Sequence, residues 1–134
     1  MKRLAALFAA IIVLSLPALA QTKHAMLGVS FGQAAGAPTA TLTWQQLSPL
    51  PTGTTVNVYR CAGTCTALTA FTPLVTGIAP TAQGATATYV DSSVVSGTYS
   101  YYVANVNGAQ VSASSIVSGT LPLPAPTGLT VTVN

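Results

Sequence analysis

Short runs in which apolar and polar residues alternate recur along this chain, and they limit the folds that it can adopt. In the run ATLTWQQL, residues 40–47, Leu42 and Trp44 fall on one face of an extended strand and threonines fall on the other. Alternation with turn residues between the runs is typical of an all-β sandwich or barrel. Strands are therefore expected at residues 25–31, 40–47, 54–60, 71–78, 85–91, 97–106 and 110–121.

Two local signals refine this prediction. Pro73 interrupts the run 71–78, and proline within a strand is tolerated mainly at the edge of a sheet. Asn107 and Gly108 separate two alternating runs, and this pair is typical of a tight type I′ turn in which both central residues need a positive φ. Residues 97–106 and 110–121 are therefore predicted to be antiparallel neighbours.

The first 20 residues, MKRLAALFAAIIVLSLPALA, have the order of a secretory signal peptide. Lys2 and Arg3 precede a run from Leu4 to Leu16 that is apolar apart from Ser15, and small residues at 18 and 20 suit cleavage. A membrane anchor is disfavoured because Pro17 follows a short run, whereas spanning takes about 20 apolar residues. We expect a secreted, periplasmic or cell-surface protein without membrane insertion after cleavage.

Cleavage leaves 134 − 20 = 114 residues, enough for one domain at 21–121 and a tail at 122–134. The remaining charged residues are Lys23, Arg60 and Asp91, so the net charge falls from +3 to 2 − 1 = +1. Nucleic acid and anionic membrane surfaces attract clusters of lysine and arginine. No such cluster remains, and no nucleic-acid partner is expected.

Cys61 and Cys65 are the two cysteines of the chain, four positions apart. Zinc needs four ligands or three and a water, but the chain adds one histidine, His24, and one acid, Asp91. A redox motif would normally be Cys-x-x-Cys near a helix. In an exported chain with two cysteines a disulfide is the default, worth about 2 kcal/mol for so short a loop. We predict a disulfide that holds the turn between them, and no metal site.

Catalysis is not expected, and neither is a cofactor. General acid–base chemistry needs histidine, paired carboxylates or similar groups within mutual reach, whereas this chain has one acidic side chain. A serine nucleophile would need a base, and His24 lies at the start of the exported chain. Asp91, in YVDSS, is interpreted as a turn residue that accepts hydrogen bonds from nearby backbone N–H groups.

Tyr59 and Tyr102 are predicted to point away from the core if Val58 and Tyr101 point into it. Two exposed rings, with Asn57 as a polar neighbour, are the one feature of the sequence that could recognise a ligand such as a sugar. Cross-strand aromatic packing explains the same residues without any ligand, and we favour it.

The runs ATLTW, VNVYR and TYVDSSVVSGTYSYYVANVNG, in this order, resemble a fibronectin type III domain of the kind common in secreted bacterial proteins. The resemblance covers about residues 38–121 and implies an Ig-like, seven-stranded sandwich of two sheets. It implies that Trp44 is the core tryptophan of the second strand and that Tyr99 occupies the "tyrosine corner" of the sixth. The Arg-Gly-Asp tripeptide that some relatives carry after the sixth strand is absent, so that activity is not implied.

This chain departs from the family pattern in two places. Asn105 stands where the family usually has a small apolar residue, and the usual proline-rich lead-in is absent at residues 21–30. Prolines at 122, 124 and 126 instead favour an extended linker, which is followed by a strand-like run at 129–133.

These observations predict a secreted, non-catalytic module for adhesion, display or the spacing of domains, with an unidentified protein or carbohydrate surface as its partner. One alternative is a cell-surface subunit that self-associates through residues 129–133, because uncharged threonine-rich strands leave sheet edges unprotected. The other is a carbohydrate-binding module that uses Tyr59 and Tyr102.

Overall fold

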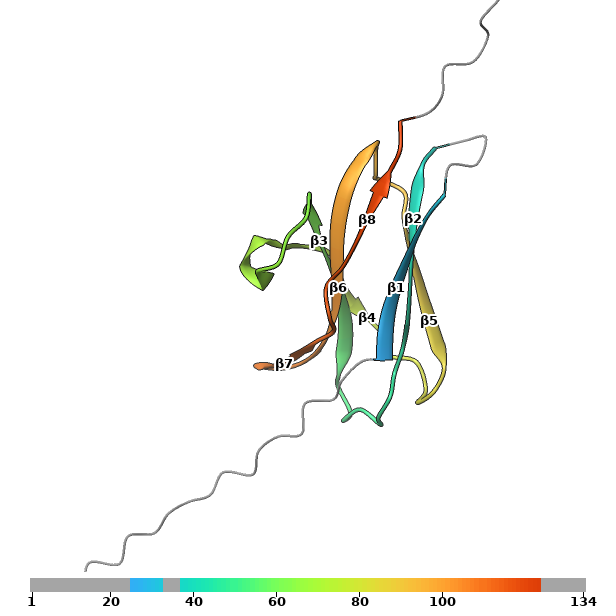
Figure 1. Cartoon of the computed structure of the whole chain (residues 1–134). Coiled ribbons are helices and arrows are strands. Elements are labelled where there is room, and N and C mark those ends of the chain that lie inside the picture. The colour runs from blue at the N-terminus through green and yellow to red at the C-terminus, as the bar shows by residue number, and fades with distance from the viewer. Residues whose placement is uncertain (1–24, 33–36, 124–134) are drawn as a thin grey trace, which may run out of the picture.

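The computed structural model describes residues 25–32 and 37–123. The expected signal peptide at 1–20, His24, and the strand-like run at 129–133 lie outside the described residues. Apart from one short 3₁₀ helix, η1 (Leu68–Ala70), the regular elements are strands (Figure 1). They are β1 (Ala25–Gly32), β2 (Thr39–Gln45), β3 (Thr55–Ala62), β4 (Thr72–Ile78), β5 (Thr86–Asp91), β6 (Gly97–Asn107), β7 (Gln110–Ala113) and β8 (Val117–Leu121).

The strands form two antiparallel sheets, so the predicted all-β class is confirmed. The smaller sheet has the order β1-β2-β5. In the larger sheet the order is β4-β3-β6, and both β7 and β8 pair with the other side of β6. The two sheets face each other as the layers of a β-sandwich (Figure 1).

The core lies between the sheets and follows the alternation of the strands. On β2, Leu42 is fully buried and Trp44 is 3% exposed, whereas their neighbours Thr41 and Thr43 are half-buried on the other face. From the larger sheet, Val58 of β3 belongs to the same core cluster as Leu42 and Trp44. The expected inward face of β2 is thus confirmed, because burial of apolar side chains selects the register of each strand.

The expected strand at 110–121 is instead two strands, so the described residues contain eight strands rather than the seven that the resemblance implies. The break occurs at residues 114–116, where the side chain of Ser114, rather than a backbone carbonyl, accepts the hydrogen bond from a backbone N–H of β6. Its Oγ accepts a hydrogen bond from the Val103 N–H at 3.1 Å, and the Ser114 N–H donates to the Val103 carbonyl at 2.8 Å. Side-chain hydrogen bonding of this kind competes with the regular ladder of a sheet.

The tight turn after β6 is confirmed, but its predicted position is one residue too early. Asn107 pairs with Gln110, so the two loop residues are Gly108 and Ala109. Gly108 has φ of 57°, a value that glycine adopts without steric cost. The side chain of Asn107 instead donates a hydrogen bond to Thr54, which precedes β3.

One side of the sandwich is closed by contact between β1 and β8. A Cβ atom on Gly119 of β8 would overlap the ring of Phe31 on β1, so the ring lies directly against the glycine backbone. Gly32 of β1 provides a contrast, because a Cβ atom there would meet Thr39 Oγ1 at 3.6 Å, an ordinary contact.

Replacement of Gly119 by alanine is therefore expected to reduce the free energy of unfolding by about 1–3 kcal/mol, because the added methyl group must displace the Phe31 ring. Urea unfolding followed by Trp44 fluorescence measures the change. Gly32→Ala is the matched control and should be neutral. Equal effects of the two substitutions would show that β8 does not pack on Phe31.

Candidate functional site

Asp91, at the end of β5, lies in a hydrogen-bond network that joins the two sheets. Its Oδ2 atom accepts hydrogen bonds from Arg60 Nη1 at 2.8 Å and from the Tyr101 hydroxyl at 3.0 Å, and both of these residues belong to the larger sheet. Its Oδ1 atom accepts from the N–H and the hydroxyl of Ser93 at 2.9 Å and 2.7 Å. With the carboxylate 2% exposed, all of its partners are protein groups that satisfy a buried charge.

The pKa values in this network follow from burial and hydrogen bonding. Burial alone would raise the pKa of Asp91, but the hydrogen bonds from Ser93, Arg60 and Tyr101 outweigh it and hold the pKa below its ordinary value. Burial and the charge of Asp91 raise the pKa of the Tyr101 hydroxyl. The network is therefore a carboxylate, a guanidinium and a neutral phenol at neutral pH.

The interpretation of Asp91 as a turn residue captured only half of its role. The bonds from Ser93 form the expected turn, whereas the ion pair with Arg60 spans 31 positions and was missed. One signal was present in the sequence. Arg60 and Asp91 are the only charged side chains in the described part of the chain, and a buried charge needs an opposite partner.

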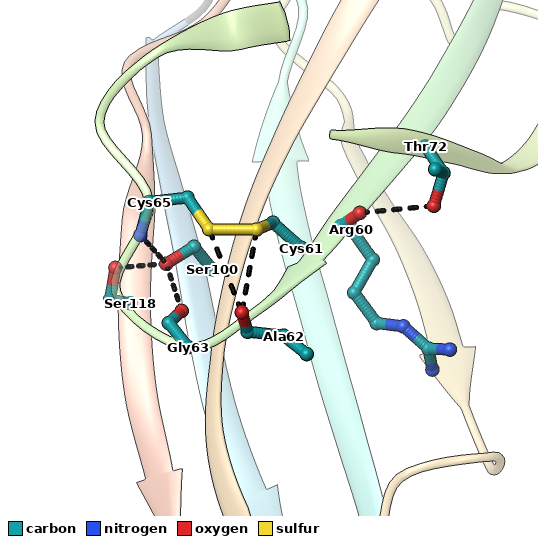
Figure 2. The surroundings of a disulfide bond; sticks show 8 residues. All are labelled: Arg60, Cys61, Ala62, Gly63, Cys65, Thr72, Ser100 and Ser118. Carbon is teal, nitrogen blue, oxygen red and sulfur yellow. Dashed lines mark hydrogen bonds between the residues drawn. A yellow bond between two sulfur atoms is a disulfide. The ribbon is translucent and has the colours of Figure 1, made fainter. Parts of the chain in front are cut away.

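The predicted disulfide between Cys61 and Cys65 is present, and Figure 2 shows how its loop is fixed. The hydroxyl of Ser100 on β6 donates to the Gly63 carbonyl at 2.7 Å and accepts from the Cys65 N–H at 3.0 Å. Its oxygen also lies 2.7 Å from that of Ser118 on β8, which can then act as the donor. Ser100 is fully buried, and the three hydrogen-bond contacts of its hydroxyl join the disulfide loop to β6 and β8.

The chain that follows the disulfide folds back over the outer face of the larger sheet. Phe71 packs edge-on against Tyr102, with ring centroids 5.0 Å apart, and Tyr102 is 7% exposed. Together with Ala104 these residues form a second, smaller core outside the sandwich. Strand alternation did not predict this cover, because Phe71 lies between η1 and β4 rather than within a strand.

Tyr59 and Tyr102 point to the predicted outer face, where their rings stack at 4.5 Å with an interplanar angle of 4°. Asn57 Nδ2 donates to the Tyr59 hydroxyl at 3.3 Å, and Asn57 Oδ1 accepts from the Gly77 N–H at 2.9 Å. The stack covers one face of each ring, while Phe71 packs against Tyr102 as well. Sugar binding here stays a prediction, and the burial of Tyr102 leaves Tyr59 as the more accessible of the two rings.

Trp44 and Tyr99 both lie in the main core cluster, as the core markers were expected to do. The Tyr99 hydroxyl accepts a hydrogen bond from the Val95 N–H at 3.1 Å, four residues upstream. A tyrosine bonded to the backbone just before its own strand is the contact that the "tyrosine corner" describes. The Arg60 guanidinium carbon also lies 5.6 Å from the Tyr99 ring centroid, which adds a cation–π contact.

Three loops meet at one end of the sandwich, which we call the loop end: 46–54, 79–85 and the turn 108–109 with its flanking Asn107. Gln83 Nε2 donates to the Leu47 carbonyl at 2.9 Å, and the Gly84 N–H donates to the Gln46 carbonyl at 2.8 Å. Asn107 Nδ2 donates to Thr54 Oγ1 at 3.0 Å and lies 3.3 Å from the Thr52 carbonyl. The loop 46–54 is therefore hydrogen-bonded to the loop 79–85 and to Asn107, which flanks the turn, without any charged side chain.

Beneath the loop end lies a buried polar pair. Asn105 is 5% exposed, and its Nδ2 donates to Gln46 Oε1 at 3.3 Å. Gln46 in turn donates to the Ser48 carbonyl at 3.0 Å. Asn105 Oδ1 has no hydrogen-bond partner among the described residues, which costs about 1–3 kcal/mol for a buried acceptor. The pair fixes the base of the 46–54 loop against β6.

Because Asp91 is the single acidic side chain of the chain, its depressed pKa predicts how stability depends on pH. Stability from a lowered carboxyl pKa is present above the unfolded value, about 3.9, and is lost as the pH falls through the folded value. The free energy of unfolding should be constant from about pH 5 to 8 and then fall by up to about 1.4 kcal/mol per pH unit in acid.

The matched variant is Asp91→Asn, which is less stable at neutral pH but has no carboxyl group to titrate at this site. Urea unfolding of both proteins at a series of pH values gives the difference in their free energies of unfolding. That difference should shrink below about pH 4, while the C-terminal carboxylate and His24 affect both proteins alike. A difference that is constant down to pH 2 would contradict the assigned network.

Among the described residues, no three of the types His, Cys, Asp and Glu come together as a metal site, and no helix is long and apolar enough to cross a membrane. The chain matches no protein-family model, no curated protein and no solved structure. The geometry of the molecule is therefore the basis on which its function can be inferred.

Proposed function

We propose that this chain is a secreted, non-catalytic β-sandwich module that displays its loop end and spaces neighbouring domains. The resemblance to fibronectin type III domains supports this proposal, and the two facing antiparallel sheets are compatible with it. In this proposal residues 1–20 are removed on export, and the disulfide between Cys61 and Cys65 suits the oxidising compartment that the chain then enters.

The use of the potentially reactive side chains supports a non-catalytic role. Arg60, Asp91 and Tyr101 bind one another, and the hydroxyl of Ser100 is used to hold the disulfide loop. A general acid, base or nucleophile must be able to reach a substrate. Each of these groups instead satisfies a neighbour inside the fold.

The path of the chain supports spacing. Ala25 of β1 pairs with Gln45, next to the loop 46–54 at the loop end. Leu121 of β8 pairs with Gly97, at the opposite end of the sandwich (Figure 1). The described chain therefore enters at one end and leaves at the other, which is the geometry needed to hold flanking segments apart in a line.

The observation that carries the display function is the hydrogen bonding of the loop 46–54 both to the loop 79–85 and to Asn107 beside the turn 108–109. Loops that are preorganised lose less entropy when a partner binds, so they provide a better surface than independent loops do. The exposed residues Thr52, Ala82 and Ala109 on the three loops are small and uncharged. Such a surface fits a neutral protein or polysaccharide rather than a charged ligand.

Attachment of beads coated with the chain from Gln21 onward tests display. The beads are offered surfaces of cellulose, chitin and gelatin, and the wild type is expected to attach to at least one. Thr52→Lys/Ala82→Lys places two charges on the loop end and should reduce attachment to the level of uncoated beads. Val95→Lys is the matched control, because Val95 is 65% exposed and belongs to the opposite end.

Three outcomes would contradict the proposal. Wild-type beads that attach to none of these surfaces, or equal attachment by both variants, would exclude display by the loop end. Turnover of ester, glycoside or peptide substrates by the wild type, lost in a folded Asp91→Asn variant, would exclude a non-catalytic module.

A further inference from the structure

The free edges of the two sheets differ in how they are protected against pairing with another strand. β4, at one edge of the larger sheet, contains Pro73 and a glycine, Gly77, with φ of 76°. Its pairing with β3 also shifts register twice. Proline, irregular pairing and bends are the devices by which sheet edges avoid adding a further strand.

The opposite edge of the larger sheet and the first edge of the smaller sheet protect each other. β8 lies beside β1, with the Phe31 ring against Gly119, and β7 has only four residues. The pairing of β1 with β2 has a register shift between Ala25 and Gly28. These edges are short, irregular or covered.

β5 has none of these protections. Its six residues, TATYVD, pair with β2 in one continuous register and contain neither proline nor glycine. Its side chains Thr86, Thr88 and Val90 are exposed, with Val90 at 50%. The one charge of this strand, on Asp91, is turned inward. Figure 1 shows β5 at the margin of the smaller sheet.

The backbone of this edge is open as well. In a two-sided ladder, an edge strand bonds its neighbour with half of its N–H and C=O groups and presents the other half outward. Within the described residues, no loop donates or accepts a backbone hydrogen bond along Thr86–Asp91 outside the pairing with β2. The edge is therefore a template for strand addition.

The chain itself carries a segment that suits this template. Residues 129–133, LTVTV, alternate apolar side chains with threonines, as the first four residues of β5 do, and they carry no charge that would be repelled. They follow β8, which lies next to β1 and therefore at the margin of the sandwich away from β5. The last described strand and the β5 edge thus lie on opposite sides of the sandwich.

We propose that residues 129–133 of one copy add as a strand to the β5 edge of a second copy. Prolines at 122, 124 and 126 favour an extended spacer, which carries the segment away from its own sandwich rather than across its end. The contact is between two different surfaces, so each added copy presents a fresh segment and a fresh edge. Such a head-to-tail contact continues into filaments unless its rotation closes a ring.

Light scattering of the chain from Gln21 onward, over a range of concentrations, tests this proposal. The mass should rise with concentration and should not level off at the dimer. Val131→Pro removes a strand N–H from the donor segment, outside the described fold, and should keep the chain monomeric. Val90→Lys on β5 should do the same, because it places a charge on the receiving edge.

Val111→Lys on β7 is the matched control, since Val111 is a similarly exposed valine at 64%, and it should assemble as the wild type does. Amide hydrogen exchange locates the contact, and assembly should slow exchange at residues 86–91. Slowed exchange confined to β4 would overturn the assignment of the edge, and a wild type that stays monomeric would overturn self-assembly.

A synthetic peptide of residues 126–134 separates pairing between copies from pairing within one copy. It should bind the monomeric Val131→Pro chain and protect β5 in hydrogen exchange. A wild type that is monomeric, has a protected β5 and does not bind the peptide would show that the segment pairs with its own sandwich, which contradicts the proposal. These outcomes do not depend on the loop end, so failure of display by the loops leaves this test unaffected.

Discussion

The interaction on which the rest of this structure depends is the buried carboxylate of Asp91. At 2% exposure it must be fully hydrogen-bonded, and its donors come from the following turn and from both strands at the centre of the opposite sheet. Arg60 and Tyr101 can reach it only if the two sheets keep one relative position. Removing one partner of a buried ion pair typically costs about 3–5 kcal/mol, a large part of the roughly 5–15 kcal/mol that stabilises a typical domain. The hydrogen bonds of Asp91 therefore pin the two sheets in one relative position. Burial of apolar side chains alone would allow more than one arrangement of the sheets.

This use of charge determines the nature of the surface. The single acidic side chain of the chain, Asp91, is buried, and its partner Arg60 is 27% exposed. Apart from Arg60, the surface of the described residues therefore consists of neutral groups. The loops of the loop end are bound through amides, hydroxyls and carbonyls, and the disulfide loop is bound through Ser100. The same feature leaves β5 without a charged guard residue, because the one charge on that strand faces the core. The proposed display by the loop end and the proposed strand addition at β5 thus both rest on one distribution of charge.

Much of the fold could be predicted because burial selects side chains at alternate positions. The sequence pattern correctly predicted the inward faces of two strands, which carry Leu42, Trp44 and Val58. It also correctly predicted, from Pro73, that β4 lies at a sheet edge. The prediction was wrong where a polar side chain altered the ladder, as Ser114 does by dividing the expected last strand. It was incomplete where contacts cross long stretches of sequence, as with Arg60 and Asp91 or with Phe71 over Tyr102. Local sequence patterns predict where a strand lies and which of its faces is buried. They do not predict which distant loop packs over the strand.

A double-mutant cycle on Arg60 and Asp91 tests most directly whether the buried carboxylate pins the two sheets. The free energies of unfolding of the wild type, Arg60→Met, Asp91→Asn and the double variant are measured by urea denaturation at pH 7. If the pair pins the sheets, the single substitutions are not additive, and the coupling energy is about 2–3 kcal/mol. Arg60→Lys should retain part of this coupling, since it keeps the charge. Additive effects, with a coupling energy below about 0.5 kcal/mol, would contradict a central role for the carboxylate of Asp91.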